Sequence, residues 1–481
     1  MYHNMSLIKL EKITNGTFWL QIDSVELRML CGCPADAIKF LIKKGYIQEL
    51  VENNQKKIIG PNALLLSDKH IQNGRVSNFG EFPILHMFYV QGMLVPSSPN
   101  YGLTPYMIGS SEMIENQLKY LITGNYGLTD QHELDTCYSS KKLANDMMEA
   151  KLYFASGGFV GYSDILHKIR LEDQEVKNLK GDAKIKRLKP NVFQVSFRDE
   201  TVELDLNLNS GETYGKTFSA KKFTVPEATF SVSNFGNGDG WSPEQPCFSS
   251  LMVMDGKKFL IDAGPNLNYI LDACGMSPDD IDGIFQTHIH DDHFCGYETL
   301  WQRKKPLKVY LAEPVRRGIR KKLTSALYTT IEEVDRRYEF VVLPFDSWIG
   351  VDNFEVQTLI SPHSVETSVF IFRRRHGNGF KSYAHFGDLI SFRVLDSITT
   401  KDGGSLKVSE ETARMVRENY LRPADFKKID IGGGMIHGDA IDFIKDTSTL
   451  KSLGHINRHL TTEEMKMGIF EPFGATQILI P

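Results

Sequence analysis

Residues 287–293, Thr-His-Ile-His-Asp-Asp-His, decide the fold of this chain. They follow a short apolar run, 281–287, that is typical of a buried strand, and they precede 294–301, which can open a helix. His288 and His290 are two apart on an extended backbone, so their side chains point the same way and can share one cation. Asp292 and His293 project differently and suit a second cation. Imidazole and carboxylate are ligands of zinc and ferrous ions, so the stretch predicts a paired metal site.

This H-x-H-x-D-H arrangement resembles the metal motif of the metallo-β-lactamase superfamily, and the resemblance extends over residues 226–481. In that family a strand ending in Asp-x-Gly precedes the motif, and residues 259–264 here are Phe-Leu-Ile-Asp-Ala-Gly. The resemblance further implies a later histidine, matched in Ser-Pro-His-Ser, a bridging aspartate, matched in Phe-Gly-Asp, and a last histidine, matched in Leu-Gly-His. The implied metal ligands are His288, His290, Asp292, His293, His363, Asp388 and His455.

Two of these positions have competitors in the sequence. His459, four residues after His455, is the alternative last ligand. Glu366 is a rival to His363, because some iron-using relatives replace this histidine with a carboxylate. His385 is expected to be a supporting or core residue rather than a ligand.

His437 lies in the run Asp-Ile-Gly-Gly-Gly-Met-Ile-His-Gly, which starts at Asp430. This run looks like the motif in which phosphodiesterase members of the superfamily, the tRNA 3′-processing endonucleases among them, place a histidine beside the metals. Those relatives continue with Glu-Ala-Thr, whereas Gly438 and Asp439 follow here, so the motif supplies no glutamate to support the imidazole. We assign His437 as the proton donor to the leaving oxygen, and Asp292 as the second catalytic residue.

The predicted fold class is α+β, with two domains. Residues 226–481 are expected to form an αββα sandwich of the metallo-β-lactamase type. Residues 1–225 are expected to form a mixed α and β domain of unknown role, in which helices from Ser110 or Ser111 and from Ser139 precede a β-hairpin over 193–208. Regulation, homodimerisation and shaping of the substrate entrance are the roles considered for it, so a homodimer is left open.

The predicted function is that of a metal-dependent hydrolase that uses a hydroxide bridging two divalent metals. Zinc is favoured, with iron or manganese as alternatives. Two divalent ions with two aspartates and one hydroxide leave a positive site, which fits a small anionic substrate such as a small or cyclic nucleotide phosphodiester. Two other functions stay open: a di-iron oxygenase of the same fold that acts on a carrier-bound substrate, and a metal-containing ligand sensor.

Composition sets the remaining expectations. The 481 residues are 41% hydrophobic and 24% charged with a formal net charge of −5, which makes nucleic acid an unlikely partner. The basic residues Arg316, Arg317, Arg320, Lys321 and Lys322 are expected to form the solvated side of a helix. No secretory signal and no membrane span are visible, so we expect a cytoplasmic protein without membrane contact.

The six cysteines are too few and too irregularly spaced for a disulfide framework. Cys31 and Cys33 form a C-x-C pair with no second pair nearby to complete a zinc site. Pro34 fits the first position of a helix, and Gly45 can end that helix.

Overall fold

The computed structural model of the protein describes residues 6–52, 55–399 and 407–481. Its contacts divide the chain into two compact units. The first contains residues 1–122, 160–217 and 325–328, and the second contains 123–159, 218–324 and 329–481. The predicted division into 1–225 and 226–481 stays a prediction, because a compact unit is not by itself an independently folding domain. Residues 123–159, from the first half of the sequence, thus join the second unit.

The first unit is built on two sheets. The larger sheet contains β1 (Lys9–Thr14), β2 (Thr17–Ile22), β3 (Leu27–Cys31), β6 (Ala63–Leu65), β9 (Tyr106–Gly109) and β10 (His167–Arg170), in that order. The smaller sheet contains β11 (Val176–Asn178), β12 (Lys184–Lys189), β13 (Val192–Phe197) and β14 (Glu200–Asp205). The hairpin predicted over 193–208 is therefore confirmed as β13 and β14. Leu20, Met29, Phe193 and Val195 belong to one buried cluster that joins both sheets.

Short elements complete the first unit. They are α1 (Ala37–Lys43), α2 (Glu81–Leu85), α6 (Tyr162–Ile165), the short helices η1 (Asp23–Val25) and η2 (His86–Val90), and the two-stranded pairs β4 (Gln48–Glu52) with β5 (Gln55–Ile59) and β7 (Ile71–Gln72) with β8 (Arg75–Val76). Helix α3 (Ser111–Tyr126) begins in this unit and ends in the second.

The second unit contains two larger sheets. The first sheet has the order β20 (Tyr338–Val342), β19 (Leu307–Leu311), β18 (Gly283–Phe285), β17 (Lys257–Ile261), β16 (Ser249–Met254), β15 (Phe230–Gly236) and β27 (Thr476–Ile480). The second sheet has the order β21 (Trp348–Val351), β22 (Phe354–Ser361), β23 (Thr367–His376), β24 (Gly379–Phe386), β25 (Phe426–Asp430) and β26 (Leu450–Gly454). Phe259 and Phe285 of the first sheet share a buried cluster with Phe354 and Phe372 of the second, so the two sheets pack face to face.

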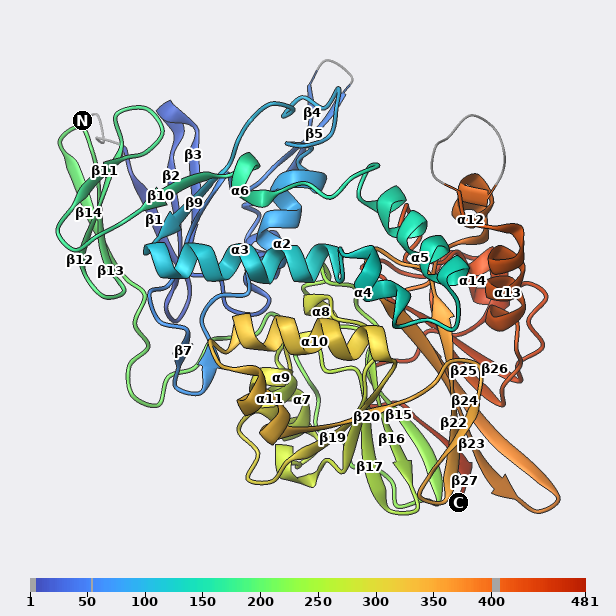
Figure 1. Ribbon diagram of the computed structural model, residues 1–481. Coiled ribbons are helices and arrows are strands. Elements are labelled where there is room, and N and C mark those ends of the chain that lie inside the picture. The colour runs from blue at the N-terminus through green and yellow to red at the C-terminus, as the bar shows by residue number, and fades with distance from the viewer. Residues whose placement is uncertain (1–5, 53–54, 400–406) are drawn as a thin grey trace. The chain divides into compact units, whose positions relative to one another are not determined.

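Helices cover the outer faces of this sandwich, as Figure 1 shows. Those beside the first sheet are α7 (Leu267–Ala273), α8 (Asp291–Phe294), α9 (Tyr297–Leu300), α10 (Glu313–Ala326) and α11 (Ile331–Arg337), with the short helix η3 (Pro278–Asp280). Those beside the second sheet are α4 (Gln131–Asp135), α5 (Lys141–Phe154), α12 (Phe392–Thr399), α13 (Glu410–Tyr420) and α14 (Glu464–Met467), with the short helix η4 (Ala440–Phe443). The predicted αββα sandwich is confirmed.

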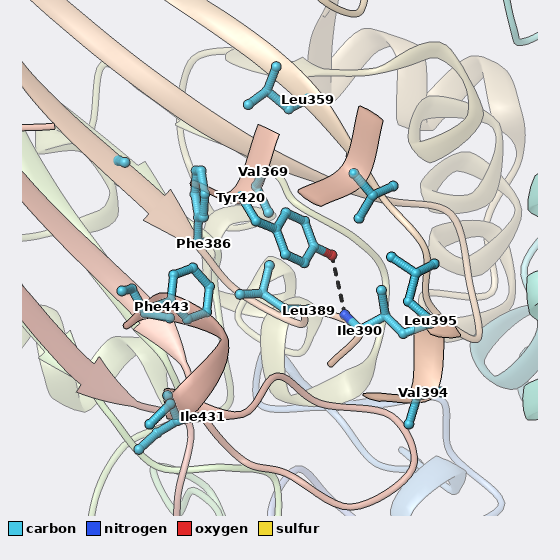
Figure 2. Close-up of a cluster of buried hydrophobic side chains, with 14 of the residues drawn as sticks. Leu359, Val369, Phe386, Leu389, Ile390, Val394, Leu395, Tyr420, Ile431 and Phe443 are labelled. Carbon is cyan, nitrogen blue, oxygen red and sulfur yellow. Dashed lines mark hydrogen bonds between the residues drawn. The ribbon is translucent and has the colours of Figure 1, made fainter. Parts of the chain in front are cut away.

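One apolar core lies under the helices of the second sheet. Leu359, Val369 and Phe386 from the sheet pack with Val394 of α12 and Tyr420 of α13 in this cluster (Figure 2). The hydroxyl of Tyr420 accepts a hydrogen bond of 3.2 Å from the backbone amide of Ile390, which satisfies its polar atom inside the core.

Several local predictions need adjustment. Pro34 does not begin a helix: α1 begins at Ala37, after Asp36 in a left-handed conformation (φ 62°). Ser140, not Ser139, caps α5, because its side chain accepts a hydrogen bond from Leu143 N. The helix expected from Ser110 or Ser111 begins at Ser111 and ends at Tyr126.

All six cysteines lie within the described ranges, and none of them forms a disulfide there. Within those same ranges, no helix combines the length and the apolar character that crossing a bilayer demands.

Candidate metal centre

The ends of three strands of the sandwich bring polar side chains to one edge. Asp262 follows β17, Asp388 lies two residues after β24, and His455 follows β26. Their φ angles are 62°, 50° and 61°, in the left-handed region that non-glycine residues rarely adopt. Each costs about 1–3 kcal/mol, and such strain clusters at functional sites. Since all three residues are buried, the surrounding structure holds them in this conformation.

The sequence motif meets these residues at the same edge. His288 and His290 follow β18, while Asp292 and His293 lie in the one-turn helix α8. Gly264 allows the end of β17 to approach the motif, because a Cβ there would lie 2.5 Å from the carbonyl oxygen of Asp292. The close approach thus explains on steric grounds why the Asp-x-Gly pattern ends in glycine.

A first donor set forms around one oxygen of Asp388. Its Oδ2 lies 3.4 Å from His288 Nε2 and 3.3 Å from His363 Nε2. His363 Nε2 lies 3.3 Å from His290 Nδ1. These four residues can present their donor atoms to one ion.

A second donor set forms around the other oxygen of Asp388. Its Oδ1 lies 3.0 Å from His293 Nε2 and 3.4 Å from His455 Nε2. The two imidazole nitrogens are 3.3 Å apart, and His455 Nε2 is 3.3 Å from Asp292 Oδ2. Asp388 therefore faces both sets, one oxygen to each.

These separations fit metal coordination. Bonds of about 2.0–2.1 Å in a tetrahedral site put neighbouring donor atoms about 3.3–3.4 Å apart. The buried Nε2 of His288 has no hydrogen-bond partner among the described residues, as expected of a nitrogen that is directed at an ion. Asp262, Asp292, Asp388 and Asp430 are at most 4% exposed, and buried carboxylates of this number require compensating positive charge. The donor set therefore fits two divalent cations.

Supporting contacts turn the imidazoles toward the two donor sets. His293 Nδ1 lies 2.7 Å from Asp262 Oδ2, which leaves Nε2 free to face the other donors. Thr287 Oγ1 lies 2.9 Å from His288 Nδ1 and donates to Asp262. Burial lowers the pKa of His288 well below its usual range and lowers the pKa of His363 to about 4. Both imidazoles are therefore neutral, which metal coordination requires.

His437 lies beside the two donor sets, and its ring is more exposed than the histidine rings of those sets. Its side chain is 18% exposed, against at most 2% for His363 and His455. Its ring centroid is 4.5 Å from that of His455, and its Nδ1 is 3.1 Å from Asp430 Oδ2. Burial opposes a charge on this imidazole, but Asp430 outweighs the burial and the pKa of His437 is raised. The missing Glu-Ala-Thr glutamate is thus replaced by a carboxylate at the end of β25.

Asp430→Asn is expected to lower enzymatic turnover about 10- to 100-fold, because it removes the carboxylate that orients His437, and loss of the carboxylates that orient imidazoles in metal sites has effects of this size. Asp430 accepts hydrogen bonds from the backbone amides of Leu389, Gly432 and Gly438, so the amide side chain also weakens this loop. Steady-state kinetics together with the thermal unfolding midpoint separate these effects. Asp439→Asn, a partly exposed carboxylate two residues after His437, is the control and should retain turnover.

The other candidate residues lie outside the two donor sets. His459 is exposed and belongs to none of the potential metal-binding groups of the described residues. Both oxygens of Glu366 are occupied, one by Lys151 Nζ and one by Leu128 N. His385 is buried and lies 2.8 Å from the Tyr383 hydroxyl through its Nδ1.

The prediction that the basic residues of α10 form a solvated side is wrong for Lys322. This side chain is fully buried, and its Nζ lies 2.7 Å from Asp291 Oδ1 and donates to the carbonyl oxygen of Ile289. It fixes the backbone between the two histidines of the motif. Gly318, one helical turn earlier, lies on the same face of α10 and packs on the side chain of Ile289. A run of basic residues does not by itself show which of them lies on that face.

Comparison with known proteins places this geometry in a family. The family model described as "Anti-Pycsar protein Apyc1" matches residues 230–388. Ribonuclease Z of Methanococcus maripaludis strain C5 is 32% identical over 129 residues, which are 26% of this chain and 41% of that protein. Ribonuclease Z of Pyrococcus abyssi is 27% identical over 144 residues, 29% of this chain and 46% of that protein. The chain belongs to the metallo-β-lactamase superfamily.

Both of these relatives are named ribonuclease Z, and each matches less than a third of this chain, which carries an additional N-terminal region. The chain spans less than half the length of these curated relatives. The metallo-β-lactamase fold protein YhfI of Bacillus subtilis aligns with 52% of this chain and 99% of its own length, at 13% identity and a TM-score of 0.39.

The expectation that nucleic acid is an unlikely partner is wrong. Its basis was the net charge of −5, whereas the sequence relatives are ribonucleases by name. A net charge averages over the whole surface, so it does not report the local field at one edge of a sandwich, where bound cations would add positive charge.

Proposed function

We propose that this chain is a metal-dependent phosphodiesterase whose two donor sets hold two divalent cations. The proposed ligands are His288, His290, Asp292, His293, His363, Asp388 and His455. The observation that carries the proposal is the position of Asp388, which lies 3.3 Å from His363 through one oxygen and 3.0 Å from His293 through the other. A carboxylate in this position suits a bridge between two ions.

Zinc is the proposed metal, since the imidazole and carboxylate donors and their near-tetrahedral spacing suit it. Iron and manganese accept the same donors and stay alternatives. When bound, a pair of divalent cations lowers the pKa of water to about 7 and offsets negative charge on phosphoryl oxygens. The protein supplies the enclosed carboxylates and imidazoles that would keep such a pair in place.

The charge of the site favours an anionic substrate. Two divalent cations bring four positive charges, and Asp292 and Asp388 offset two of them. His437, oriented by Asp430, is the group proposed to donate a proton to the leaving oxygen. Asp292 acts by holding its cation beside His455. A phosphodiester suits both the positive charge of the site and its proton donor, because it carries a negative charge and needs a proton on its departing alkoxide.

The proposed substrate class is the phosphodiester of a nucleotide. The sequence relatives named ribonuclease Z favour RNA, and a small or cyclic nucleotide diester is the second candidate, since a single phosphodiester suffices to meet the two donor sets. A cytoplasmic location stays a prediction.

Chelation is expected to abolish phosphodiester hydrolysis, and added zinc is expected to restore it, because the proposed chemistry depends on both cations. The measurement is turnover of bis(p-nitrophenyl) phosphate, cyclic nucleotides and a short RNA before and after EDTA, with metal content determined in parallel. Two zinc ions per chain and chelator-sensitive turnover support the proposal.

Other outcomes would point elsewhere. Hydrolysis that survives complete metal removal contradicts the proposal. Two iron atoms per purified chain with no diester turnover favour the oxygenase, and tight product binding without turnover on diesters, thioesters or lactones favours the sensor.

A further inference from the structure

Helix α5 comes from the first half of the sequence but packs in the second unit, beside the first donor set. Ala150 and Phe154 belong to the same buried cluster as Leu359 and Val369 of the second sheet. The ring centroid of Phe154 lies 6.0 Å from that of His363. A segment more than 200 residues earlier in the chain thus touches a proposed metal ligand.

The polar centre of this contact is a buried ion pair. Lys151 Nζ lies 2.5 Å from Glu366 Oε1, and the two side chains are 3% and 2% exposed. Glu366 Oε2 accepts a hydrogen bond of 3.1 Å from Leu128 N, and Lys151 also donates to the carbonyl oxygen of Leu128. Gly127 leaves room for this carboxylate, because a Cβ at that position would lie 2.1 Å from Glu366 Oε2.

The loop that carries Glu366 contributes His363 to the first donor set. It connects β22, which ends at Ser361, to β23, which begins at Thr367. His363 lies 3.3 Å from His290, and Ser364 Oγ lies 3.1 Å from the other nitrogen of the same imidazole. The second donor set draws its residues from α8 and from the ends of β24 and β26.

We propose that Lys151 and Glu366 are positioning residues for His363, and that they set the affinity of the first donor set for its cation without setting that of the second. This inference rests on the proposed cation pair. A buried ion pair has one favourable geometry, because each charge is desolvated and depends on its partner. The pair therefore fixes the β22–β23 loop at a point three residues from His363. If apolar contacts alone held this loop, it could shift and move the imidazole of His363.

Further contacts attach the α4–α5 segment, which comes from the N-terminal half of the sequence, to helices of the unit that holds the metal centre. Glu133 of α4 pairs with Lys321 of α10, and its carbonyl oxygen accepts from Arg317. Asp146 of α5 accepts from Ser409 and Thr412 at the start of α13. The α4–α5 segment is thus attached to α10 beside the first sheet and to α13 beside the second.

The test is a zinc titration of the full chain in competition with a chromophoric chelator. The double variant Lys151→Met/Glu366→Met removes both charges and leaves no lone buried ion. We expect one of the two zinc affinities to weaken about 10- to 100-fold, the range for loss of a residue that supports a ligand, and the other to stay within about twofold. Cobalt substitution adds a spectroscopic readout, in which the absorption of one site should decrease selectively.

Lys427 and Asp446 provide a matched control, since they form another fully buried ion pair in the same unit. Lys427→Met/Asp446→Met should lower the thermal unfolding midpoint while both zinc affinities stay unchanged. If the first double variant does not fold, Glu366→Gln retains the shape of the side chain and should show the same selectivity with a smaller change.

Two results overturn the inference: unchanged zinc affinities in a folded variant, or equal weakening of both sites. A wild-type chain that binds two zinc ions but hydrolyses no phosphodiester would contradict the proposed activity and leave this inference standing. A wild-type chain that binds a single zinc ion would overturn the inference as well.

Discussion

Asp388→Ala is expected to empty both cation sites and to reduce phosphodiester turnover by at least about 10³-fold. The single carboxylate faces both donor sets, so its removal takes one donor from each. Metal-ion stabilisation is worth several kcal/mol in hydrolytic reactions, and each 1.36 kcal/mol corresponds to about a tenfold change in rate. Single-ligand variants such as His363→Ala should instead reduce the metal content by one ion.

The measurement combines metal content after gel filtration with turnover of bis(p-nitrophenyl) phosphate. Asp425→Ala is the matched control. Asp425 directly precedes β25 and accepts hydrogen bonds from Ser382 and Lys381 of β24, away from the end of β24 that Asp388 follows. That variant should keep two ions and wild-type turnover. An Asp388→Ala protein that retained both ions would remove the basis for a bridging carboxylate.

The resemblance placed the proposed ligands best where they follow strands. The resemblance implied that the motif, His363, Asp388 and His455 converge, because they occur in the family's order along the chain, and the structure brings them within 3.0–3.6 Å of their neighbours. The reason is physical: the ends of neighbouring strands meet at one edge of a sheet, so polar residues that end apolar runs gather there. Their left-handed conformations could not be predicted, since Asp and His adopt positive φ more often than most non-glycine residues but still at only a minority of positions.

Supporting residues were harder to predict. Asp430 ends β25 much as Asp388 follows β24, whereas the Glu-Ala-Thr motif of the relatives places the support for His437 after it, at Gly438 and Asp439. Asp262 was noted only as part of a pattern, although it contacts His293 and Thr287. Contacts of this kind depend on which strands are neighbours.

Long-range pairs left no signal in the sequence. Glu366 is near enough to His363 to look like a ligand, and only its pairing with Lys151, 215 positions earlier, gives it another role. Met147, Ala150 and Phe154 fall at helical spacing on one face of α5, and all three are buried. This spacing could not indicate that this face packs beside the metal centre, because amphipathic spacing does not identify the partner of a helix.

His437→Ala is expected to reduce turnover of alkyl phosphodiesters about 10²- to 10⁴-fold, the range for loss of a positioned acid. The effect should be much smaller for bis(p-nitrophenyl) phosphate, because a p-nitrophenolate leaves without a proton. Metal content should stay at two ions, since His437 belongs to the proposed machinery as a proton donor and not as a ligand. His459→Ala, an exposed imidazole, is the control and should leave both substrates unaffected.

The pH dependence of alkyl diester turnover should follow from the protonation of His437. Burial works against its charge, but Asp430 raises the pKa of His437 above its usual value, so the protonated form persists above about pH 6.5 and is lost as the pH rises through the raised value. Turnover of alkyl diesters should therefore decline on the alkaline side, and Asp430→Asn should move that decline to lower pH. If the alkaline limb is unchanged in Asp430→Asn and persists in His437→Ala, the proton comes from another group, and His437 has no part in protonating the leaving oxygen.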